Sequence, residues 1–96
     1  MDYNYKILYI NKKERWITIK SNDKFDSYEP DSFICLMKRI RDGTNGIIED
    51  IGDTRYRING NGLKLIYQWD GCFGISIIYP KGSHLDGVIK FLEQYF

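Results

Sequence analysis

The amino-acid sequence predicts an α+β domain, in which two helices pack on a mostly antiparallel sheet of about five strands in the order β-β-α-β-β-β-α. Segments that alternate apolar and polar residues indicate the strands, and two segments with apolar residues three or four positions apart indicate the helices. Short connections between successive strands favour antiparallel pairing. The chain has 96 residues, which is the size of one domain, so we assign residues 1–96 to a single domain.

The first two predicted strands form a hairpin. Residues 4–10 alternate, and we expect Tyr5, Ile7 and Tyr9 to share one face. Residues 15–20 are rich in β-branched and aromatic side chains, which favour strands. Only the polar residues 11–14 separate the two segments, so we expect antiparallel pairing.

The first predicted helix begins near Pro30, because the missing N–H of proline costs nothing in the first turn. An apolar stripe at helical spacing follows, formed by Phe33, Leu36, Met37 and Ile40. We expect Gly43 to end the helix. Basic residues gather near this end, namely Lys38, Arg39 and Arg41. We interpret them as a solvated helix end that matches the helix dipole, and contact with a partner is the alternative.

The following segments predict the rest of the sheet. Residues 47–51 are a short candidate strand, and residues 54–59 alternate, with the two arginines at 55 and 57 on one face. Residues 63–70 and 73–79 flank a turn at Asp70-Gly71-Cys72 and give the strongest hairpin signal in the chain. Ile66 and Ile78 fall on the second face of this hairpin. We therefore expect the hairpin to be central and partly covered on both sides.

A second amphipathic helix is predicted at the C-terminus. Residues 83–86 resemble a capping box with Asp in place of Glu or Gln. The apolar stripe of this helix consists of Leu85, Val88, Ile89, Leu92 and Phe96.

Composition limits the classes of function. The chain has 14 basic and 13 acidic residues. A net charge near zero argues against binding of nucleic acid over a large basic surface. No apolar run reaches the roughly 20 residues of a membrane helix, and the first residues lack the pattern of a secretory signal. We therefore expect a cytoplasmic protein without a membrane partner, whose Cys35 and Cys72 stay reduced.

The sequence contains no recognisable catalytic set. His84, the only histidine, falls in the first turn of the last predicted helix, and Cys72 has no activating neighbour in the sequence. An acidic cluster could serve glycosidic hydrolysis or bind a metal ion; it consists of Glu49, Asp50 and Asp53, with Asp70 further along the chain. Carboxylates at strand ends and turns are, however, more often solvated or turn-forming. Motifs for metal or phosphate binding are missing. We therefore expect no catalytic residue, no metal ligand and no cofactor, and hence no enzyme.

The last third of the chain carries a pattern of its own. A strand ends in Trp69-Asp70, a tight turn and Phe73-Gly74 follow, and an apolar strand leads to Tyr79-Pro80 and a closing helix. This pattern resembles small immunity proteins that are encoded beside bacterial polymorphic or contact-dependent growth-inhibition toxins. The resemblance implies a cytoplasmic, non-enzymatic protein that binds one cognate toxin domain, commonly a nuclease, and blocks its active site in a 1:1 complex. It also implies that Trp69 packs in the core and that Asp70 and Gly71 fix the turn.

The candidate contact residues come from local clusters rather than from the resemblance. We expect Glu49, Asp50 and Asp53 to face a basic toxin cleft, with Arg55, Tyr56 and Arg57 beside them. For Arg55 and Arg57, an exposed strand face without a partner is an equally good interpretation. We expect no direct contact with nucleic acid.

Two other functions stay open. The first is a small RNA-binding or ribonuclease domain that uses basic residues with Tyr56, namely Lys38, Arg39, Arg41, Arg55 and Arg57. In its favour, residues 71–79 loosely resemble the RNA-stacking strand of an RRM domain, although Asp70 stands where that motif has a basic residue. The second is a structural or oligomerisation module, since eight tyrosines and two tryptophans suit an interface.

Overall fold

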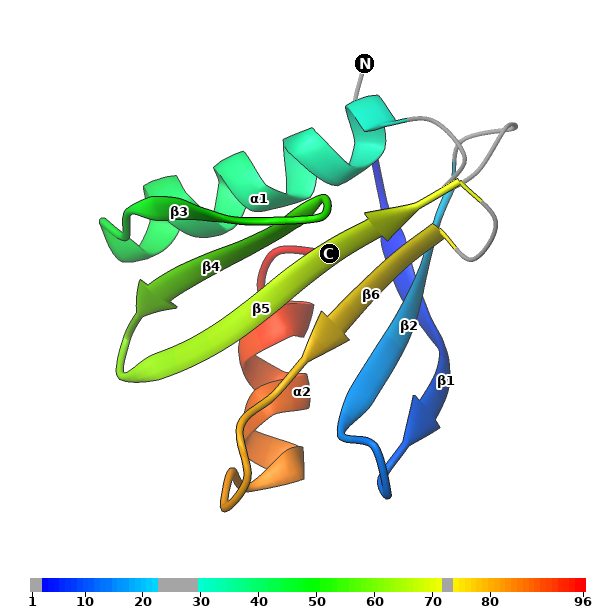
Figure 1. Cartoon of the computed structure of the whole chain (residues 1–96), viewed down its shortest axis with the longest axis vertical. Helices are drawn as coiled ribbons and strands as arrows, with labels where there is room; N and C mark the ends of the chain where they lie inside the picture. The colour runs from blue at the N-terminus through cyan, green and yellow to red at the C-terminus, as the bar shows by residue number, and fades with distance from the viewer. Residues whose placement is uncertain (1–2, 23–29, 72–73) are drawn as a thin grey trace.

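The computed structural model describes residues 3–22, 30–71 and 74–96, and these form one six-stranded sheet with two helices (Figure 1). The strands lie in the order β1-β2-β6-β5-β4-β3, and each neighbouring pair is antiparallel. The α+β class is confirmed. The sheet has six strands rather than about five, because the short segment after the first helix forms a complete edge strand. The elements are β1 Tyr5–Asn11, β2 Trp16–Ser21, α1 Pro30–Thr44, β3 Ile48–Gly52, β4 Arg55–Gly60, β5 Leu63–Asp70, β6 Gly74–Ile78 and α2 Leu85–Glu93.

The β1–β2 hairpin forms as predicted, but the expected alternation of β1 is wrong beyond Ile7. The register shifts between Ile7, which pairs with Ile19, and Tyr9, which pairs with Thr18. Such a bulge inserts one extra residue and reverses which side chains face the core. Tyr9 is therefore 60% exposed, and Ile10 packs against the core in its place.

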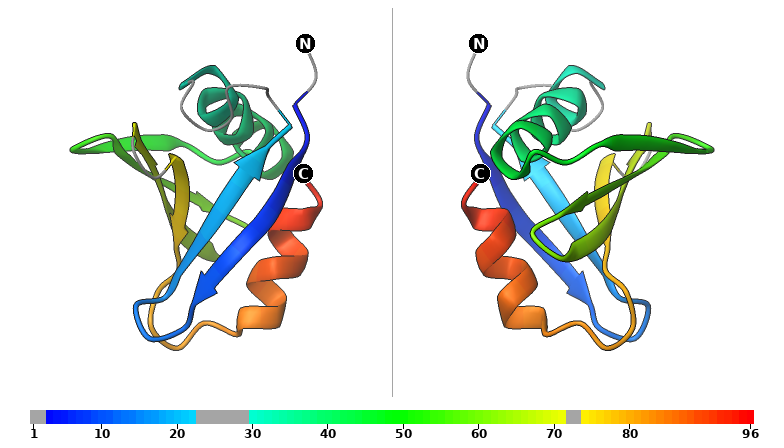
Figure 2. Two further views of the ribbon diagram at one scale, coloured as in Figure 1. Left: turned by 90° about the vertical axis from the view of Figure 1, so that its right-hand side faces the viewer. Right: turned by 90° about the vertical axis from the view of Figure 1, so that its left-hand side faces the viewer.

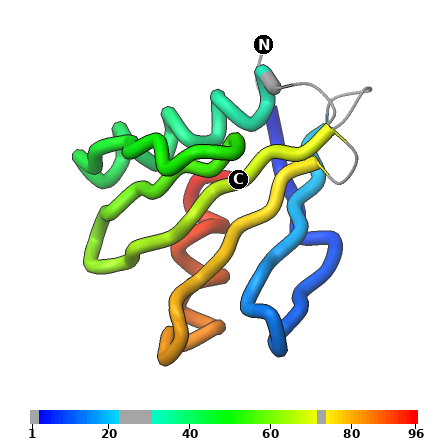
Figure 3. The backbone as a smooth tube through the Cα atoms, in the orientation of Figure 1, coloured from blue at the N-terminus to red at the C-terminus, as the bar shows by residue number. Residues whose placement is uncertain are grey.

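The four strands after α1 form a meander that runs from one edge of the sheet back to its centre. Figure 3 shows this path, which brings β6 alongside β2 although most of the chain separates them. The β5–β6 hairpin is central, as predicted. Ile66 and Ile78 are half-buried, but no helix among the described residues covers their side of the sheet. Cys72 and Phe73, which complete the predicted turn and strand, lie outside the described residues.

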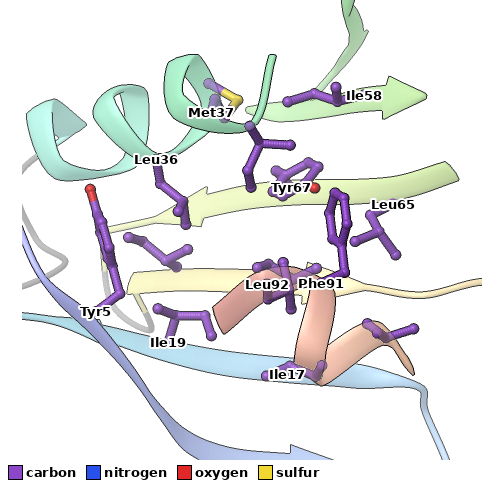
Figure 4. Packing of buried hydrophobic residues seen from close by; sticks show 14 of the residues in the cluster. Tyr5, Ile17, Ile19, Leu36, Met37, Ile58, Leu65, Tyr67, Phe91 and Leu92 are labelled. Atoms are coloured by element: carbon purple, nitrogen blue, oxygen red, sulfur yellow. The ribbon is translucent and has the colours of Figure 1, made fainter. Parts of the chain in front are cut away.

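Both helices pack on one side of the twisted sheet (Figure 2). All four stripe residues of α1 are buried, and they join the inward side chains of β2, β4, β5 and β6 in a single core (Figure 4). The helix ends at Thr44 rather than at Gly43. A Cβ on Gly43 would lie 2.4 Å from Cε1 of Tyr95, so this glycine allows close packing, and Asn45, with φ of 55°, takes the left-handed position after the helix.

The expected capping box of α2 does not form. His84 is the N-cap residue and makes no side-chain cap hydrogen bond. Val88 and Leu92 of the predicted stripe are buried, and Phe91 is buried as well. Phe96 lies beyond the helix, where its ring stands 5.9 Å from that of Tyr5. No helix among the described residues is long and apolar enough to cross a membrane.

Candidate functional site

The six predicted contact residues all lie on the β3–β4 hairpin, at one edge of the sheet. Local chemistry explains the sharp reversal between the strands. Gly52, Asp53 and Thr54 all have positive φ, at 92°, 56° and 56°, and Gly and Asp tolerate this conformation better than most residues. The Asp50 carboxylate accepts a hydrogen bond of 2.9 Å from the Gly52 amide. Asp50 and Asp53 are thus turn-forming residues that remain exposed.

The pleat divides the six residues between the two faces of the hairpin. Glu49, Arg55 and Arg57 lie on the side without helices, where Arg57 Nη1 donates to Glu49 Oε1 at 2.8 Å. Both side chains of this ion pair remain substantially exposed, so it contributes little to stability. Arg55 is exposed as well. The predicted alternation of β4 is therefore confirmed.

Tyr56 lies on the helix side, where its ring is 5.9 Å from that of Phe33. The two rings border an apolar pocket of about 220 Å³. The remaining lining residues come from α1 and from the ends of β4 and β5, and they are Ile34, Met37, Thr54 and Trp69. A pocket of this size is comparable to one large apolar side chain, and nearly all of its lining is apolar.

Thr54 belongs to the turn between β3 and β4 and also lines the pocket. Its hydroxyl oxygen lies 2.7 Å from the carbonyl oxygen of Trp69, to which it donates, and the Trp69 amide donates back to the Thr54 carbonyl at 3.2 Å. A β-branched residue with positive φ is strained, and these two hydrogen bonds hold Thr54 in place. These hydrogen bonds link the β3–β4 turn to the end of β5 beside the pocket.

Exposed apolar side chains surround the hairpin and extend this surface. Ile47 is 80% exposed, Ile34 40% and Ile51 36%. Within the described part of the chain, the strand β3 pairs with β4 alone. Apolar and charged side chains thus share an edge of the domain.

Of the six expected contact residues, Tyr56 lines the pocket, whereas sequence reasoning did not identify Ile34, Thr54 and Trp69 as part of a site. Ile34 carried a signal, because it is apolar yet lies off the helical stripe of α1. Thr54 gave no signal, since only the backbone angles and the contact with Trp69 identify it. Trp69 is partly buried and packs against the core, as the resemblance implied, but it also faces the pocket.

The other candidate residues lie away from the hairpin. His84 is exposed at the start of α2, and Cys35 is a partly buried free thiol on α1. Within the described ranges, no group of three His, Cys, Asp or Glu side chains could hold a metal ion. The basic residues of α1 lie on the helix side of the domain. Arg39 donates to the Tyr95 carbonyl at 3.2 Å and covers the ring of Tyr5, so its contacts are structural.

Two buried tyrosines show the most strongly perturbed ionisation. Burial raises the pKa of both Tyr5 and Tyr67 far above the ordinary value. The Tyr5 hydroxyl donates to the Ser32 carbonyl at 2.5 Å, whereas the Tyr67 hydroxyl has no hydrogen-bond partner among the described residues. Both belong to the core.

Comparisons with protein-family models, with curated proteins and with solved structures found no match to this chain. We therefore infer the function from the geometry of the hairpin, its pocket and the sheet, together with the sequence resemblance of the last third of the chain.

Proposed function

We propose that this protein is an immunity protein that binds a bacterial toxin domain, commonly a nuclease, and blocks its active site in a 1:1 complex. The protein acts by binding rather than by catalysis. One observation carries the proposal: the contact residues expected from the sequence lie on one hairpin at an edge of the described sheet, where Tyr56 borders an apolar pocket and Asp50 and Asp53 form the adjoining turn.

The chemistry of this surface suits a tight protein contact. Strong interfaces combine a few apolar or aromatic anchors in pockets with charged neighbours at the rim. The pocket beside Tyr56 accepts one apolar side chain of the toxin, while Asp50 and Asp53 at the turn contact basic groups at its active-site cleft. Inhibition must be tight because free toxin is harmful, and a nanomolar dissociation constant corresponds to about −12 kcal/mol.

The test is a binding titration of the purified protein with the C-terminal domain of the toxin encoded beside its gene. We expect a 1:1 complex and loss of toxin activity at one equivalent. Asp53→Asn removes one charge while keeping a residue that tolerates positive φ, and Ile34→Lys places a charge at the rim of the pocket. Each should weaken binding at least tenfold.

Asp86→Asn is the matched control, because Asp86 is an exposed residue on α2, away from the hairpin. It should leave the dissociation constant unchanged. Failure of the adjacent toxin domain to bind would contradict the proposed function. Tight binding that Asp53→Asn and Ile34→Lys leave unchanged would keep the function but remove the hairpin as its contact surface.

A further inference from the structure

The side of the sheet without helices presents an ordered set of side chains, which we call the open face. The strand register places them in two rows across the sheet. One row consists of Tyr9, Thr18, Ser76, Gln68 and Arg55. The other consists of Asn11, Trp16, Ile78, Ile66, Arg57 and Glu49. The open face therefore runs from aromatic residues at β1 and β2 to arginines at β4.

Two aromatic side chains are exposed at the β1–β2 end of the open face. Tyr9 is 60% exposed and Trp16 is 41% exposed. Because Tyr9 pairs with Thr18 and Asn11 pairs with Trp16, the two rings occupy diagonal positions on neighbouring strands, within reach of one ligand. Tyr9 reaches this face only because of the β1 bulge, and bulges often redirect a side chain at a functional surface.

Charge is distributed unevenly over the molecule. Among the described residues, the open face carries two acidic side chains, Glu49, which pairs with Arg57, and Asp70. It carries five basic ones, although the whole chain has 14 basic and 13 acidic residues; the five are Lys6, Lys20, Arg55, Arg57 and Lys64. Lys6 and Lys20 pair at one end of the strands, and Lys64 lies at the other end beside Asn59. Between the aromatic and basic ends, one row offers the hydroxyl and amide groups of Thr18, Ser76 and Gln68, which we call the polar row, and the other row holds Ile78 and Ile66. The near-neutral composition thus conceals a face with excess positive charge.

We propose that the open face binds single-stranded nucleic acid. Bases stack on Tyr9 and Trp16, the polar row contacts base edges, and the basic side chains contact phosphates. This combination of stacking aromatic residues with a basic surface is the general way in which proteins hold single strands. The two exposed aromatic rings favour nucleic acid over an acidic protein, because every base offers a flat face on which such a ring can stack. This activity goes beyond the proposed toxin binding and does not depend on it.

The residues differ from those expected for RNA binding on the sequence. Arg55 and Arg57 belong to the open face, but Tyr56 and the basic residues of α1 lie on the helix side. The strand that resembles an RRM motif directs Ile75, Ile77 and Tyr79 into the core. The exposed rings come instead from the β1–β2 hairpin.

The experiment is a fluorescence-anisotropy titration of the full chain against a labelled 12-nucleotide oligo(U), with oligo(dT) and a 12-base-pair duplex in parallel. We expect saturable binding to the single strands that weakens with salt, since each phosphate contact adds about −0.7 to the slope of log K against log salt. Trp16→Ala and Tyr9→Ala should each weaken binding at least about fivefold, because one stacked base contributes on that scale. Trp16→Phe should recover most of the affinity.

Matched control variants distinguish the contribution of the open face to binding from that of the protein's overall charge. Lys6→Gln on the open face should weaken binding, whereas Lys90→Gln, an exposed position on α2, should not. Circular dichroism checks the fold of each variant, and Tyr9→Ala tests the loss of stacking if Trp16→Ala is unfolded. A flat titration with both single strands at low salt would overturn the proposal. Poly-glutamate that binds as tightly as oligo(U), without dependence on Trp16, would overturn it in favour of an acidic protein partner.

Discussion

Replacing Gly60 with alanine tests how closely α1 packs on the sheet. A Cβ at this position would lie 2.4 Å from Oγ1 and 2.5 Å from Cβ of Thr44. Ordinary contacts between carbon atoms are about 3.5–4.0 Å, so the end of the helix must move by about 1 Å. The Thr44 side chain cannot simply rotate away, because its hydroxyl donates to the Ile40 carbonyl one turn earlier in the helix at 2.7 Å.

The size of the effect follows from two opposing contributions. Alanine in a strand is favoured over glycine by about 0.5–1 kcal/mol, whereas overpacking costs about 1–3 kcal/mol. The overlap involves the main stem of Thr44 rather than a flexible end, so we expect a net loss of about 1–2 kcal/mol in the free energy of unfolding. In urea, the midpoint should fall by about 1 M, since the slope for small domains is about 1–3 kcal/mol per M.

The same substitution at Gly87 is the matched control. Gly87 lies on the exposed side of α2, and its added Cβ would only touch His84 Cβ at 3.9 Å. Gly87→Ala should therefore raise the urea midpoint, because alanine is favoured over glycine in helices by about 1 kcal/mol. In a double-mutant cycle, Thr44→Gly should reduce the cost of Gly60→Ala. An unchanged or raised midpoint for Gly60→Ala would refute the close packing of α1 on β4.

Three further predictions concern stability. Leu36→Ala should lower the free energy of unfolding by about 2–5 kcal/mol, because Leu36 is fully buried. Ile34→Ala should change the free energy of unfolding by less than about 1 kcal/mol. Equal urea midpoints for the two variants would contradict the assignment of Leu36 to the core. Because burial raises the pKa of Tyr5 and Tyr67 above their unfolded value of about 10, the stability that their neutral forms contribute is complete below pH 10 and is lost as the pH rises above it. Tyr67→Phe should reduce the loss of stability above pH 10 and leave the free energy of unfolding at pH 7 unchanged. Tyr5→Phe should lower the free energy of unfolding at pH 7 by about 1 kcal/mol, because it removes a hydrogen bond. Urea titrations at pH 7 and above pH 10 distinguish the two variants. Arg57→Ala should change the urea midpoint very little, because its ion pair is exposed, and a loss of more than about 1 kcal/mol would show that the pair matters more than exposed pairs usually do.

Local patterns were sufficient to predict most of the elements. Helical spacing identified all four buried stripe residues of α1, and strict alternation placed β5 at its observed bounds, Leu63–Asp70. The bulge in β1 could not be predicted, because it depends on pairing with β2 rather than on the sequence of β1 alone. Gly43 was misread for a similar reason, since the contact that requires a glycine comes from Tyr95.

The candidate site was predicted only in part. A cluster of charged residues close in sequence remains close on a hairpin, so the convergence of residues 49–57 could be expected. Their division between two faces follows from alternation. The pocket could not be anticipated, because Ile34 and Trp69 meet through the packing of α1 on distant strands. The open face likewise depends on the order of the strands, which places Trp16 beside Ile78.

The pairing of β2 with β6 has a consequence during protein synthesis. The N-terminal hairpin leaves the ribosome first, but its partner strand is only completed when Ile78 has been added. At elongation rates of about 5–20 residues per second, this delay lasts about 3–11 seconds. An isolated two-stranded hairpin is at best marginally stable, so Ile17 and Ile19 remain accessible to chaperones and proteases throughout that interval. Nascent chains that stall before β6 should therefore be degraded rather than accumulate as a partly folded species.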